Sequence, residues 1–310
     1  MQSIYQKTVS NPISFEGIGL HSGKNSKITI LPSEEDQGIV FKRVDLNKDN
    51  LVKANYVNVS SAKLCTTLEN TYGTKVSTVE HLLAALYIVG VDNALIEIDN
   101  EEVPIMDGSA KDFLDLLNNI KLVSLTKKRK FLKILNKTEL EDGLRKISIE
   151  PNDLSFEVDF QLNYENKIIG NQRNTINFDN DDLNDVSMSR TFCLYEDIEK
   201  IKKIGLAKGG SLDNAVVVDD KNVLNEGGLR NKKEFVNHKI LDLAGDFLLS
   251  GHRILGKVVC YQGGHELTNM FLRKLLITKK AFEIIELENG KTIFSKKKSF
   301  EQQAKLVANA

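Results

Sequence analysis

The sequence predicts a protein that mixes α-helices with β-strands and is divided into two parts. Its 310 residues suit one large domain or two of ordinary size. Segments with apolar residues at helical spacing and segments with strand-like alternation follow one another along the whole chain. Residues 121–130 are polar and basic, and we interpret them as an interdomain linker. We therefore expect domains at residues 1–125 and 126–300, followed by a flexible tail at 301–310.

Composition and charge argue against several functional classes. The apolar fraction of 41% is enough for a real core, and the formal net charge of -1 argues against the strongly basic surface of a nucleic-acid-binding protein. A local basic patch for a phosphorylated small molecule is compatible with this charge. The N-terminus has no apolar signal core, and no run approaches the roughly 18 apolar residues of a membrane span. We therefore expect a cytoplasmic protein without stable membrane insertion.

The cysteines indicate a reducing compartment. Cys65, Cys193 and Cys260 are an odd number, lie far apart in the chain and form no Cys-x-x-Cys pair. Free thiols fit this pattern better than a disulfide framework. A cysteine-based hydrolase is a weaker interpretation, because no histidine directly adjoins Cys193 or Cys260.

Residues 1–35 predict short strands joined by turns. Residues 27–31 alternate between polar and apolar side chains, as in a half-buried strand. The preceding loop, Gly17-Ile18-Gly19-Leu20-His21-Ser22-Gly23, has glycines on both sides of His21, which would let the backbone approach a ligand closely. For a single loop histidine, however, a solvated turn residue is the simpler interpretation.

The next informative segment predicts a buried helix that begins near Glu80. An apolar run at residues 82–89 is followed by Gly90, a common helix stop. Ser77 and Glu80 have the spacing of a capping box, in which Glu80 would only reach back to the start of the helix. Alternatively, Glu80 and His81 act as general base and ligand in one metal site, because a helix N-terminus favours a carboxylate and a negatively charged reaction centre. The sequence leaves both alternatives open.

Most other elements are predicted from periodicity and turn residues. Residues 179–187 are acidic and indicate a loop. The strand at 258–261 ends at Gly263-Gly264, so His265 lies at a glycine bend. We expect strands at 94–98, 131–135, 146–150, 156–162, 215–218 and 258–261, and helices at 110–117, around 198–204 and at about 267–275.

Residues 235–250 predict a largely buried helix, which ends before Gly251. His238, Asp242 and Asp246 form a polar stripe at i, i+4 and i+8 on one face of this otherwise apolar helix. A histidine and two carboxylates are costly to bury unless something pairs with them. A histidine and an aspartate one turn apart can both bind a single metal ion. The alternative is a solvent-facing stripe with an ordinary i, i+4 pair.

Several short motifs follow one another in a fixed order. Each motif alone is unspecific, but so many in one order are highly specific. They are Gly19-Leu20-His21-Ser22-Gly23, Ser77-Thr78-Val79-Glu80-His81-Leu82, Pro104-Ile105-Met106-Asp107-Gly108-Ser109, Ser189-Arg190-Thr191-Phe192, Val218-Asp219-Asp220, Asn225-Glu226, the helix segment from Phe235 to Asp242, and Gly264-His265. Over nearly its whole length the chain thereby resembles the zinc-dependent UDP-3-O-acyl-N-acetylglucosamine deacetylases of Gram-negative bacteria, which catalyse the committed step of lipid A biosynthesis.

The resemblance implies an α+β fold of two related domains, with helices sandwiched between two sheets. It also implies a βαβ insert in the second domain, at about residues 192–224, which forms a hydrophobic passage for the fatty acyl chain. Side chains available for this passage are Leu194, Ile198, Ile201, Leu206 and Val216. Alternatively, they are simply the core of the insert.

The resemblance implies one catalytic zinc ion, bound by His81, His238 and Asp242, although iron(II) can occupy similar ligand sets. Three protein ligands leave a fourth position for water, as in catalytic zinc sites. In this scheme Glu80 is the general base, and Thr191 stabilises the oxyanion together with the metal. His265 then protonates the leaving amine, while Asp246 orients it and raises its pKa.

The implied substrate is UDP-3-O-(3-hydroxyacyl)-N-acetylglucosamine, which would be hydrolysed to acetate and the free amine. Lys239 is the best candidate for binding the diphosphate. Four positions depart from the family pattern. Gln262 and Arg145 replace lysines, and Gln161-Leu162 replaces an Asp-Phe pair near the uridine, so we expect weaker UDP binding. Other residues expected at the substrate are Phe192, Leu206, Gly210, Ser211, His21 and Cys65, the last as a small buried residue and not a ligand.

Two rival functions remain open at this point. One is a metal-dependent amidohydrolase with a different sugar or acyl substrate. The other is a non-catalytic binding module, although such a module needs neither a general acid nor a general base. We expect a monomer that acts on a small molecule.

Overall fold

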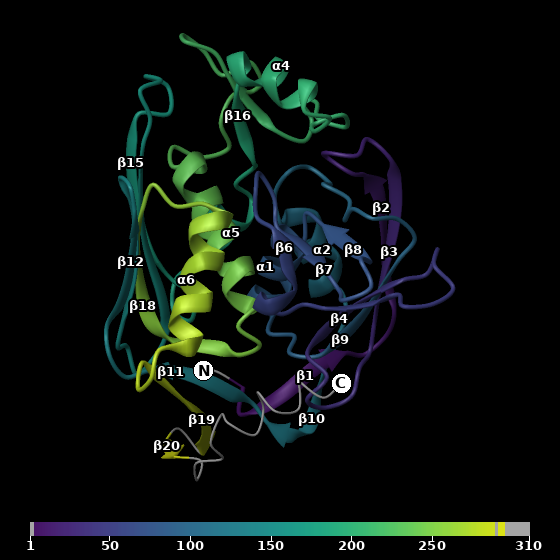
Figure 1. Cartoon of the computed structure of the whole chain (residues 1–310), viewed down its shortest axis with the longest axis vertical. Coiled ribbons are helices and arrows are strands. Elements are labelled where there is room, and N and C mark those ends of the chain that lie inside the picture. The colour runs from purple at the N-terminus through teal and green to yellow at the C-terminus, as the bar shows by residue number, and fades with distance from the viewer. Residues whose placement is uncertain (1–2, 289–290, 295–310) are drawn as a thin grey trace.

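The computed structural model describes residues 3–288 and 291–294. In this part of the chain, two large sheets face each other across a layer of helices (Figure 1). Helices α1 (Glu80–Val89), α5 (Glu234–Leu248) and α6 (His265–Ile277) lie in this middle layer, and α1 packs against α5. The arrangement confirms the α+β fold that we expected.

The first large sheet has five strands, in the order β2-β3-β9-β4-β5, within the described residues. In β3, the buried Ile28 and Ile30 alternate with the more exposed Lys27 and Thr29, which is the period of a sheet with one covered face. A smaller sheet, β6-β7-β8, adjoins the start of α1. The elements of this region are β2 (Ile13–Ile18), β3 (Asn25–Leu31), β4 (Ile39–Arg43), β5 (Leu51–Lys53), the 3-10 helix η1 (Tyr56–Asn58), β6 (Val59–Ser61), β7 (Thr67–Glu69), β8 (Lys75–Ser77), β9 (Ala94–Ile98) and α2 (Lys111–Asn118).

The second large sheet has eight strands within the described residues. Its main path is β12-β13-β18-β11-β19-β20, and β14 lies beside β18 and carries β15 on its other side. The long strand β18 (Arg253–Tyr261) pairs with β11, β13 and β14 and is the centre of this sheet. The other strands are β11 (Lys130–Ile134), β12 (Thr138–Asp142), β13 (Arg145–Glu150), β14 (Phe156–Asn163), β15 (Asn171–Asn177), β19 (Phe282–Glu288) and β20 (Lys291–Phe294).

The two halves of the chain share one topology. In the first half, hairpin β2–β3 lies antiparallel to the later strand β9. In the second half, hairpin β12–β13 lies antiparallel to the later strand β18 in the same way. On its other side, β9 runs parallel to β4, which pairs antiparallel with β5. Likewise, β18 runs parallel to β14, which pairs antiparallel with β15. A helix precedes the later strand in each half, α1 or α5, and another follows it, α2 or α6. Helices α1 and α5 are therefore equivalent elements that meet between the sheets. The boundary at residue 125 stays a prediction.

A βαβ unit interrupts the second half before α5. It consists of β16 (Phe192–Leu194), α4 (Tyr195–Lys203) and β17 (Val216–Val218), and its two strands are parallel. The unit projects beyond the helix layer at the top of Figure 1. The expected βαβ insert is thus confirmed, while its bounds at about residues 192–224 stay a prediction.

The basic segment at 121–130 forms a strand over most of its length, and none of the residues of this strand is buried. Residues 122–128 form β10 (Leu122–Lys128), which pairs antiparallel with β1 (Tyr5–Val9). The Nζ atom of Lys127 lies 2.7 Å from the Oδ2 atom of Asp36, so a charge of this run is paired. The strand itself was not predicted, because its partner β1 lies far earlier in the chain, where local charge patterns give no sign of it. The role of this segment as an interdomain linker stays a prediction.

Other differences from the predictions are local. The acidic segment 179–187 contains a short helix, α3 (Asn184–Ser187). Strands β4, β5, β12 and β15 were not predicted; in β15 only Ile176 is buried, so its sequence carries little apolar signal. The flexible tail expected at 301–310 lies outside the described residues.

Candidate active site

The helix interface brings polar side chains from the two halves together. Gly245 of α5 lies against the backbone of α1, where a Cβ atom at this position would overlap the carbonyl oxygen of Glu80 and lie 2.9 Å from its carbon. This close approach places the first turn of α1, with Glu80 and His81, beside the polar stripe of α5. His238 and Asp242 of that stripe are buried, so the alternative of a solvent-facing stripe is wrong.

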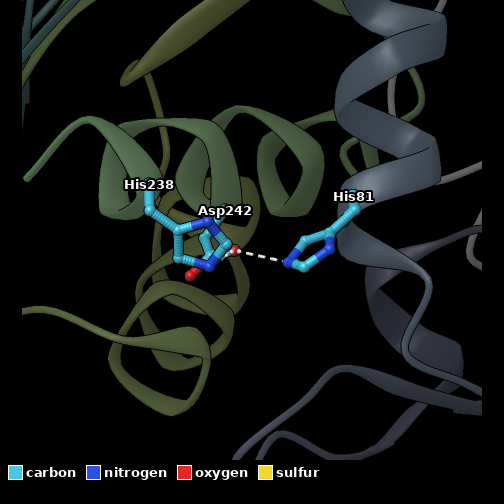
Figure 2. A group of neighbouring side chains, drawn as sticks. All are labelled: His81, His238 and Asp242. Atoms are coloured by element: carbon cyan, nitrogen blue, oxygen red, sulfur yellow. Dashed lines mark ion pairs between the residues drawn. The ribbon is translucent and has the colours of Figure 1, made fainter. Parts of the chain in front are cut away.

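Three possible metal ligands converge at this interface. The Nε2 atoms of His81 and His238 lie 3.4 Å and 3.3 Å from the same oxygen, Oδ1 of Asp242. One ligand atom of each residue lies within 4.8 Å of the other two. Figure 2 shows the two imidazoles approaching Asp242 from different helices. Oδ1 of Asp242 is buried and accepts no hydrogen bond from the described part of the chain, so a cation at this point would satisfy it.

The protonation states of these groups suit a metal ion. Burial lowers the pKa of His238 to about 3, so its imidazole is neutral at pH 7. Burial would raise the pKa of Asp242, but the neighbouring His238, Lys239 and His265 outweigh burial and hold it well below its usual range. The carbonyl oxygen of Ser189, 3.0 Å from Nδ1 of His238, accepts a hydrogen bond from Nδ1–H and leaves the lone pair of Nε2 free. A neutral histidine and an ionised carboxylate are the forms that bind metals.

Glu80 is the first residue of α1, but it does not take part in a capping box. Residue Val79 occupies the N-cap position, and no side chain caps the helix. The hydroxyl of Ser77 lies 3.3 Å from the carbonyl oxygen of Glu101, and the Glu80 carboxylate accepts the backbone N–H of Thr66 at 3.0 Å. Burial raises the pKa of Glu80, which makes its carboxylate a stronger base.

His265 lies next to the Glu80 oxygen that does not bind Thr66. Its Nε2 atom lies 3.6 Å from Oε1 of Glu80, and its Nδ1 atom lies 2.8 Å from Oδ2 of Asp246. Burial would lower the pKa of His265, but the carboxylates of Asp246, Glu80 and Asp242 outweigh burial and raise it to about 10. The arrangement therefore places a protonated imidazole and a carboxylate next to the three possible metal ligands.

These groups line a cavity between the two halves of the chain. Thr191, at the base of the βαβ unit, and Lys239 also face it. A second, larger cavity of about 380 Å³ shares Lys239 and is otherwise lined by Leu144, Arg145, Phe160, Leu162, Asn163, Tyr164, Glu165, Gln262 and Gly263. The first cavity is lined by Leu20, His21, Leu64, Thr78, Glu80, His81, Ile105, Thr191, His238, Lys239, Asp242 and His265.

Comparisons with known proteins identify the family of the chain. A family model described as UDP-3-O-acyl N-acetylglycosamine deacetylase matches residues 6–277. The chain belongs to this family. It is 41% identical over 293 residues to the UDP-3-O-acyl-N-acetylglucosamine deacetylase of Pseudoalteromonas translucida, an alignment that spans 94% of this chain and 96% of that protein. The protein of the same name from Idiomarina loihiensis is 41% identical, over 92% of this chain and 94% of its own length. The one from Geotalea uraniireducens is 40% identical, over 91% of this chain and 92% of its own length.

The deacetylase is thus a hydrolase that acts on an amide. Its thiols are poor nucleophiles, because burial raises the pKa of Cys65 and Cys260 to about 12 and also raises that of Cys193. All three are free cysteines, as we predicted. Among the described residues, none of the helices has the length and apolar character needed to cross a membrane.

Other residues expected at the substrate lie in different surroundings. His21 of the deacetylase is buried and lines the first cavity, so its interpretation as a solvated turn residue is wrong. Its Nδ1 atom lies 3.4 Å from the backbone nitrogen of Ala207. The ring of Phe192 lies under Lys239, with Nζ 5.5 Å from its centroid. Cys65 is buried near Glu80. Leu206, Gly210 and Ser211 belong to the turns after α4, which pack on the loop around His21, and they line neither of the two cavities.

Sequence reasoning missed three residues that support the site. The hydroxyl of Thr66 donates to Oδ1 of Asp246 at 2.7 Å, while its backbone binds Glu80. Glu102 accepts the backbone N–H of His21 at 2.8 Å and the hydroxyl of Thr78 at 2.9 Å. Glu234, one turn before His238, accepts hydrogen bonds from Arg190. Only Glu234 carried a signal, as a carboxylate at the start of a buried helix.

Proposed function

We propose that this deacetylase removes the N-acetyl group of UDP-3-O-(3-hydroxyacyl)-N-acetylglucosamine with the help of a zinc ion. The products are acetate and UDP-3-O-(3-hydroxyacyl)-glucosamine, and the reaction is the committed step of lipid A biosynthesis. Family membership supports the substrate class. The observation that carries the mechanism is the convergence of two imidazoles on one buried carboxylate oxygen, next to a carboxylate base and a protonated histidine.

His81, His238 and Asp242 fit zinc, which prefers histidine nitrogen and carboxylate oxygen and leaves one position open at catalytic sites. Iron(II) suits the same donor set. A bound zinc ion would supply Lewis acidity at the acetamide carbonyl and would make water a better nucleophile at neutral pH. All other steps fall to side chains of the protein.

Glu80 acts as the general base that accepts the proton of the attacking water. The backbone N–H of Thr66 fixes one of its oxygens, and the other faces His265. Thr191 lines the same cavity, and its hydroxyl donates a hydrogen bond to the oxyanion that develops on the acetamide carbonyl.

His265 acts as the general acid that protonates the leaving amine. Its contact with Asp246 supports this role, because the carboxylate accepts a hydrogen bond from Nδ1–H and directs Nε2 toward Glu80. A buried imidazole would otherwise lose its charge, and Asp246 is the strongest of the groups that retain it.

Lys239 binds the diphosphate. It lies between the two cavities, and although burial opposes its charge, Asp242 raises its pKa, so it is a cation at pH 7. The second cavity accommodates the nucleotide. There Gln262 exchanges hydrogen bonds with the backbone of Asn163, and Arg145 pairs with Glu266. Both contacts compete with phosphate, which supports weaker UDP binding than in relatives with lysines.

The βαβ unit forms the passage for the acyl chain. Helix α4 has no fully buried residue, and Ile198 and Ile201 are only half-buried, which favours a passage over a closed core. Val216 is fully buried and belongs to the core instead. Binding of substrates with graded acyl lengths tests this assignment; affinity that is independent of length would contradict it.

The test of the whole proposal compares wild type with His238→Ala. Zinc is counted per chain, and acetate release from the UDP-linked substrate is measured before and after chelation. We expect about one zinc per chain, with metal and activity both lost in His238→Ala. His252→Ala serves as the matched control, since His252 lies outside both cavities and should keep metal and activity.

Other outcomes would separate the rival functions. Bound zinc without acetate release would favour a different amide substrate, or a binding module if no acetamido sugar is hydrolysed. If wild type binds no metal, His238 and Asp242 are only an i, i+4 pair on one helix face, and the proposed mechanism is wrong. A monomeric state and a cytoplasmic location belong to the same proposal.

A further inference from the structure

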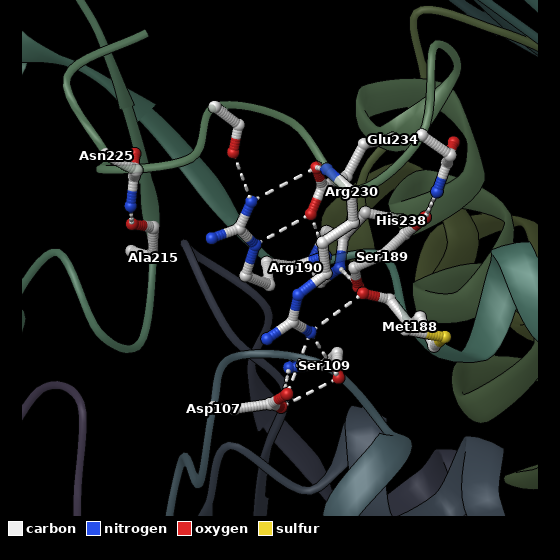
Figure 3. Close-up of polar contacts among 12 residues, drawn as sticks. Asp107, Ser109, Met188, Ser189, Arg190, Ala215, Asn225, Arg230, Glu234 and His238 are labelled. Atoms are coloured by element: carbon white, nitrogen blue, oxygen red, sulfur yellow. Dashed lines mark hydrogen bonds and ion pairs between the residues drawn. The ribbon is translucent and has the colours of Figure 1, made fainter.

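Glu234 is the first residue of α5 and is fully buried, with a side-chain exposure of 0%. Each of its carboxylate oxygens receives two hydrogen bonds. Oε1 accepts the backbone N–H of Arg190 at 3.1 Å and its Nε–H at 2.8 Å, and Oε2 accepts the backbone N–H of Arg230 at 2.6 Å and Nη2 of Arg190 at 3.3 Å. Figure 3 shows both arginines meeting this carboxylate.

One peptide group links Glu234 to the metal-binding residues. The peptide between Ser189 and Arg190 donates its N–H to Glu234 and accepts Nδ1–H of His238 at its carbonyl oxygen, at 3.0 Å. Glu234 and His238 are one turn apart on the same helix face. Because a peptide group is planar, fixing the direction of its N–H also fixes the direction of its carbonyl.

The direction of this carbonyl determines how His238 can bind a metal. A carbonyl oxygen only accepts hydrogen bonds, so Nδ1 of His238 must carry the ring proton and Nε2 presents its lone pair. Nε2 lies 3.3 Å from Oδ1 of Asp242, at the convergence point of the three ligands. A tilted carbonyl would release the ring and weaken this arrangement.

The next residue along the chain is Thr191, whose position depends on the same segment. Its backbone N–H donates to the carbonyl oxygen of Gly108 at 2.7 Å, and its own carbonyl accepts the N–H of Val216 at 2.7 Å. Arg230 continues the network into the first half of the chain, with Nη1 2.8 Å from Oδ2 of Asp107 (Figure 3). Glu234 therefore holds one end of a segment whose other end carries the proposed oxyanion donor.

We propose that Glu234 is a positioning residue, which holds the Ser189–Arg190 peptide and thereby orients both the metal ligand His238 and Thr191. The inference rests on the proposed function for the roles of His238 and Thr191. It differs from a merely structural ion pair with Arg190, which would stabilise the fold without affecting metal affinity.

Glu234→Gln tests the proposal in the full-length protein. The amide has nearly the same shape as the carboxylate. Because each carboxylate oxygen accepts two hydrogen bonds, the NH₂ group of the amide faces two N–H donors in either orientation and cannot accept from them. The metal is removed by chelation, and zinc affinity is measured by competition with a chromophoric chelator. We expect zinc to bind about 10–100-fold more weakly, and kcat to fall while KM stays within about twofold of wild type because Thr191 acts mainly in the transition state.

Asp92→Asn is the matched control. Like Glu234, Asp92 accepts hydrogen bonds from a backbone N–H, that of Lys7 at 2.7 Å, and from a buried guanidinium, that of Arg129 at 3.0 Å. Asp92 lies just after the C-terminal end of α1, whereas Glu80 lies at its N-terminal end. We expect this variant to lower Tm and leave the zinc affinity unchanged. Glu234→Asp retains the charge but shortens the side chain, and it replaces Glu234→Gln if that variant does not fold.

An unchanged zinc affinity in the folded Glu234 variant, with a loss of Tm like that of Asp92→Asn, would overturn the positioning role. If wild type binds zinc but releases no acetate, the proposed function fails, while the affinity comparison still decides the role of Glu234. If wild type binds no zinc, both proposals fail.

Discussion

The Nδ1 atom of His265 lies 2.8 Å from the Oδ2 atom of Asp246, although 19 positions separate the two residues in the chain. Asp246 belongs to α5 and His265 begins α6, so the contact exists only because these two helices pack side by side. The positive end of α6 disfavours a charged imidazole at this position. The carboxylate of Asp246 offsets this effect and keeps His265 protonated.

The first prediction concerns Asp246→Asn. Burial lowers the pKa of His265 and the carboxylates led by Asp246 raise it to about 10, so removal of this negative charge must lower it. A general acid is active below its pKa, and the basic limb of the pH–rate profile should therefore move to lower pH. We expect kcat/KM near pH 8 to fall by about 100-fold. A basic limb that stays in place in kcat/KM measurements from pH 6 to 10 would contradict this role of Asp246.

A second prediction concerns Glu80→Gln. Burial raises the pKa of Glu80 above the usual 4.5, against the opposing effects of His265 and His81. A general base is active above its pKa, so the acidic limb of wild type should lie above that value and should disappear in the variant. We expect a loss of about 10²–10⁴-fold in kcat. Zinc content should stay at the wild-type level, because Glu80 is not among the proposed ligands; persistence of the acidic limb would assign the base to another group.

The third prediction tests the support from Thr66. Thr66→Val keeps the backbone N–H that binds Glu80 but removes the hydroxyl that donates to Asp246 at 2.7 Å. One oxygen of Asp246 then stays buried without this donor. We expect a loss of about 1–3 kcal/mol in the free energy of unfolding, measured by urea titration, together with a lower kcat.

A matched control for Thr66→Val is Thr74→Val. The hydroxyl of Thr74 donates to the backbone carbonyl of Asp49 at 2.7 Å in a turn that lines neither cavity. We expect this variant to lose stability but to keep kcat. Equal effects of the two substitutions on kcat would mean that Thr66 only stabilises the fold.

A fourth prediction concerns the close approach of α1 and α5. Gly→Ala in a helix normally stabilises by about 0.5–1 kcal/mol. At Gly245 a methyl group would overlap the carbonyl oxygen of Glu80 and lie 3.1 Å from the backbone nitrogen of Ala84, so the helices must separate. We expect Gly245→Ala to destabilise by about 1–3 kcal/mol and to weaken zinc binding, because the ligands lie on both helices. A more stable variant with unchanged zinc affinity would show that this contact does not set the site.

Local patterns predicted several elements well. The apolar periodicity around Val236, Ile240 and Leu243 predicted α5 within two residues of its observed ends, and the run before Gly90 predicted α1. Both helices are buried on most sides, so nearly every turn carries an apolar signal. Strands such as β15, which bury few side chains, and β10, which depends on β1, gave no such signal.

The sequence by itself determined the residue types of the site and their spacing on α5, since a helix fixes the directions of His238, Asp242 and Asp246 through local hydrogen bonds. Its motifs also determined the family. Only the tertiary structure decided that Glu80 binds Thr66 instead of a helix cap, and that the Ser189–Arg190 peptide lies between Glu234 and His238. Such contacts join segments far apart in the chain, and they depend on how two halves of one topology pack their helices together, which no local pattern encodes.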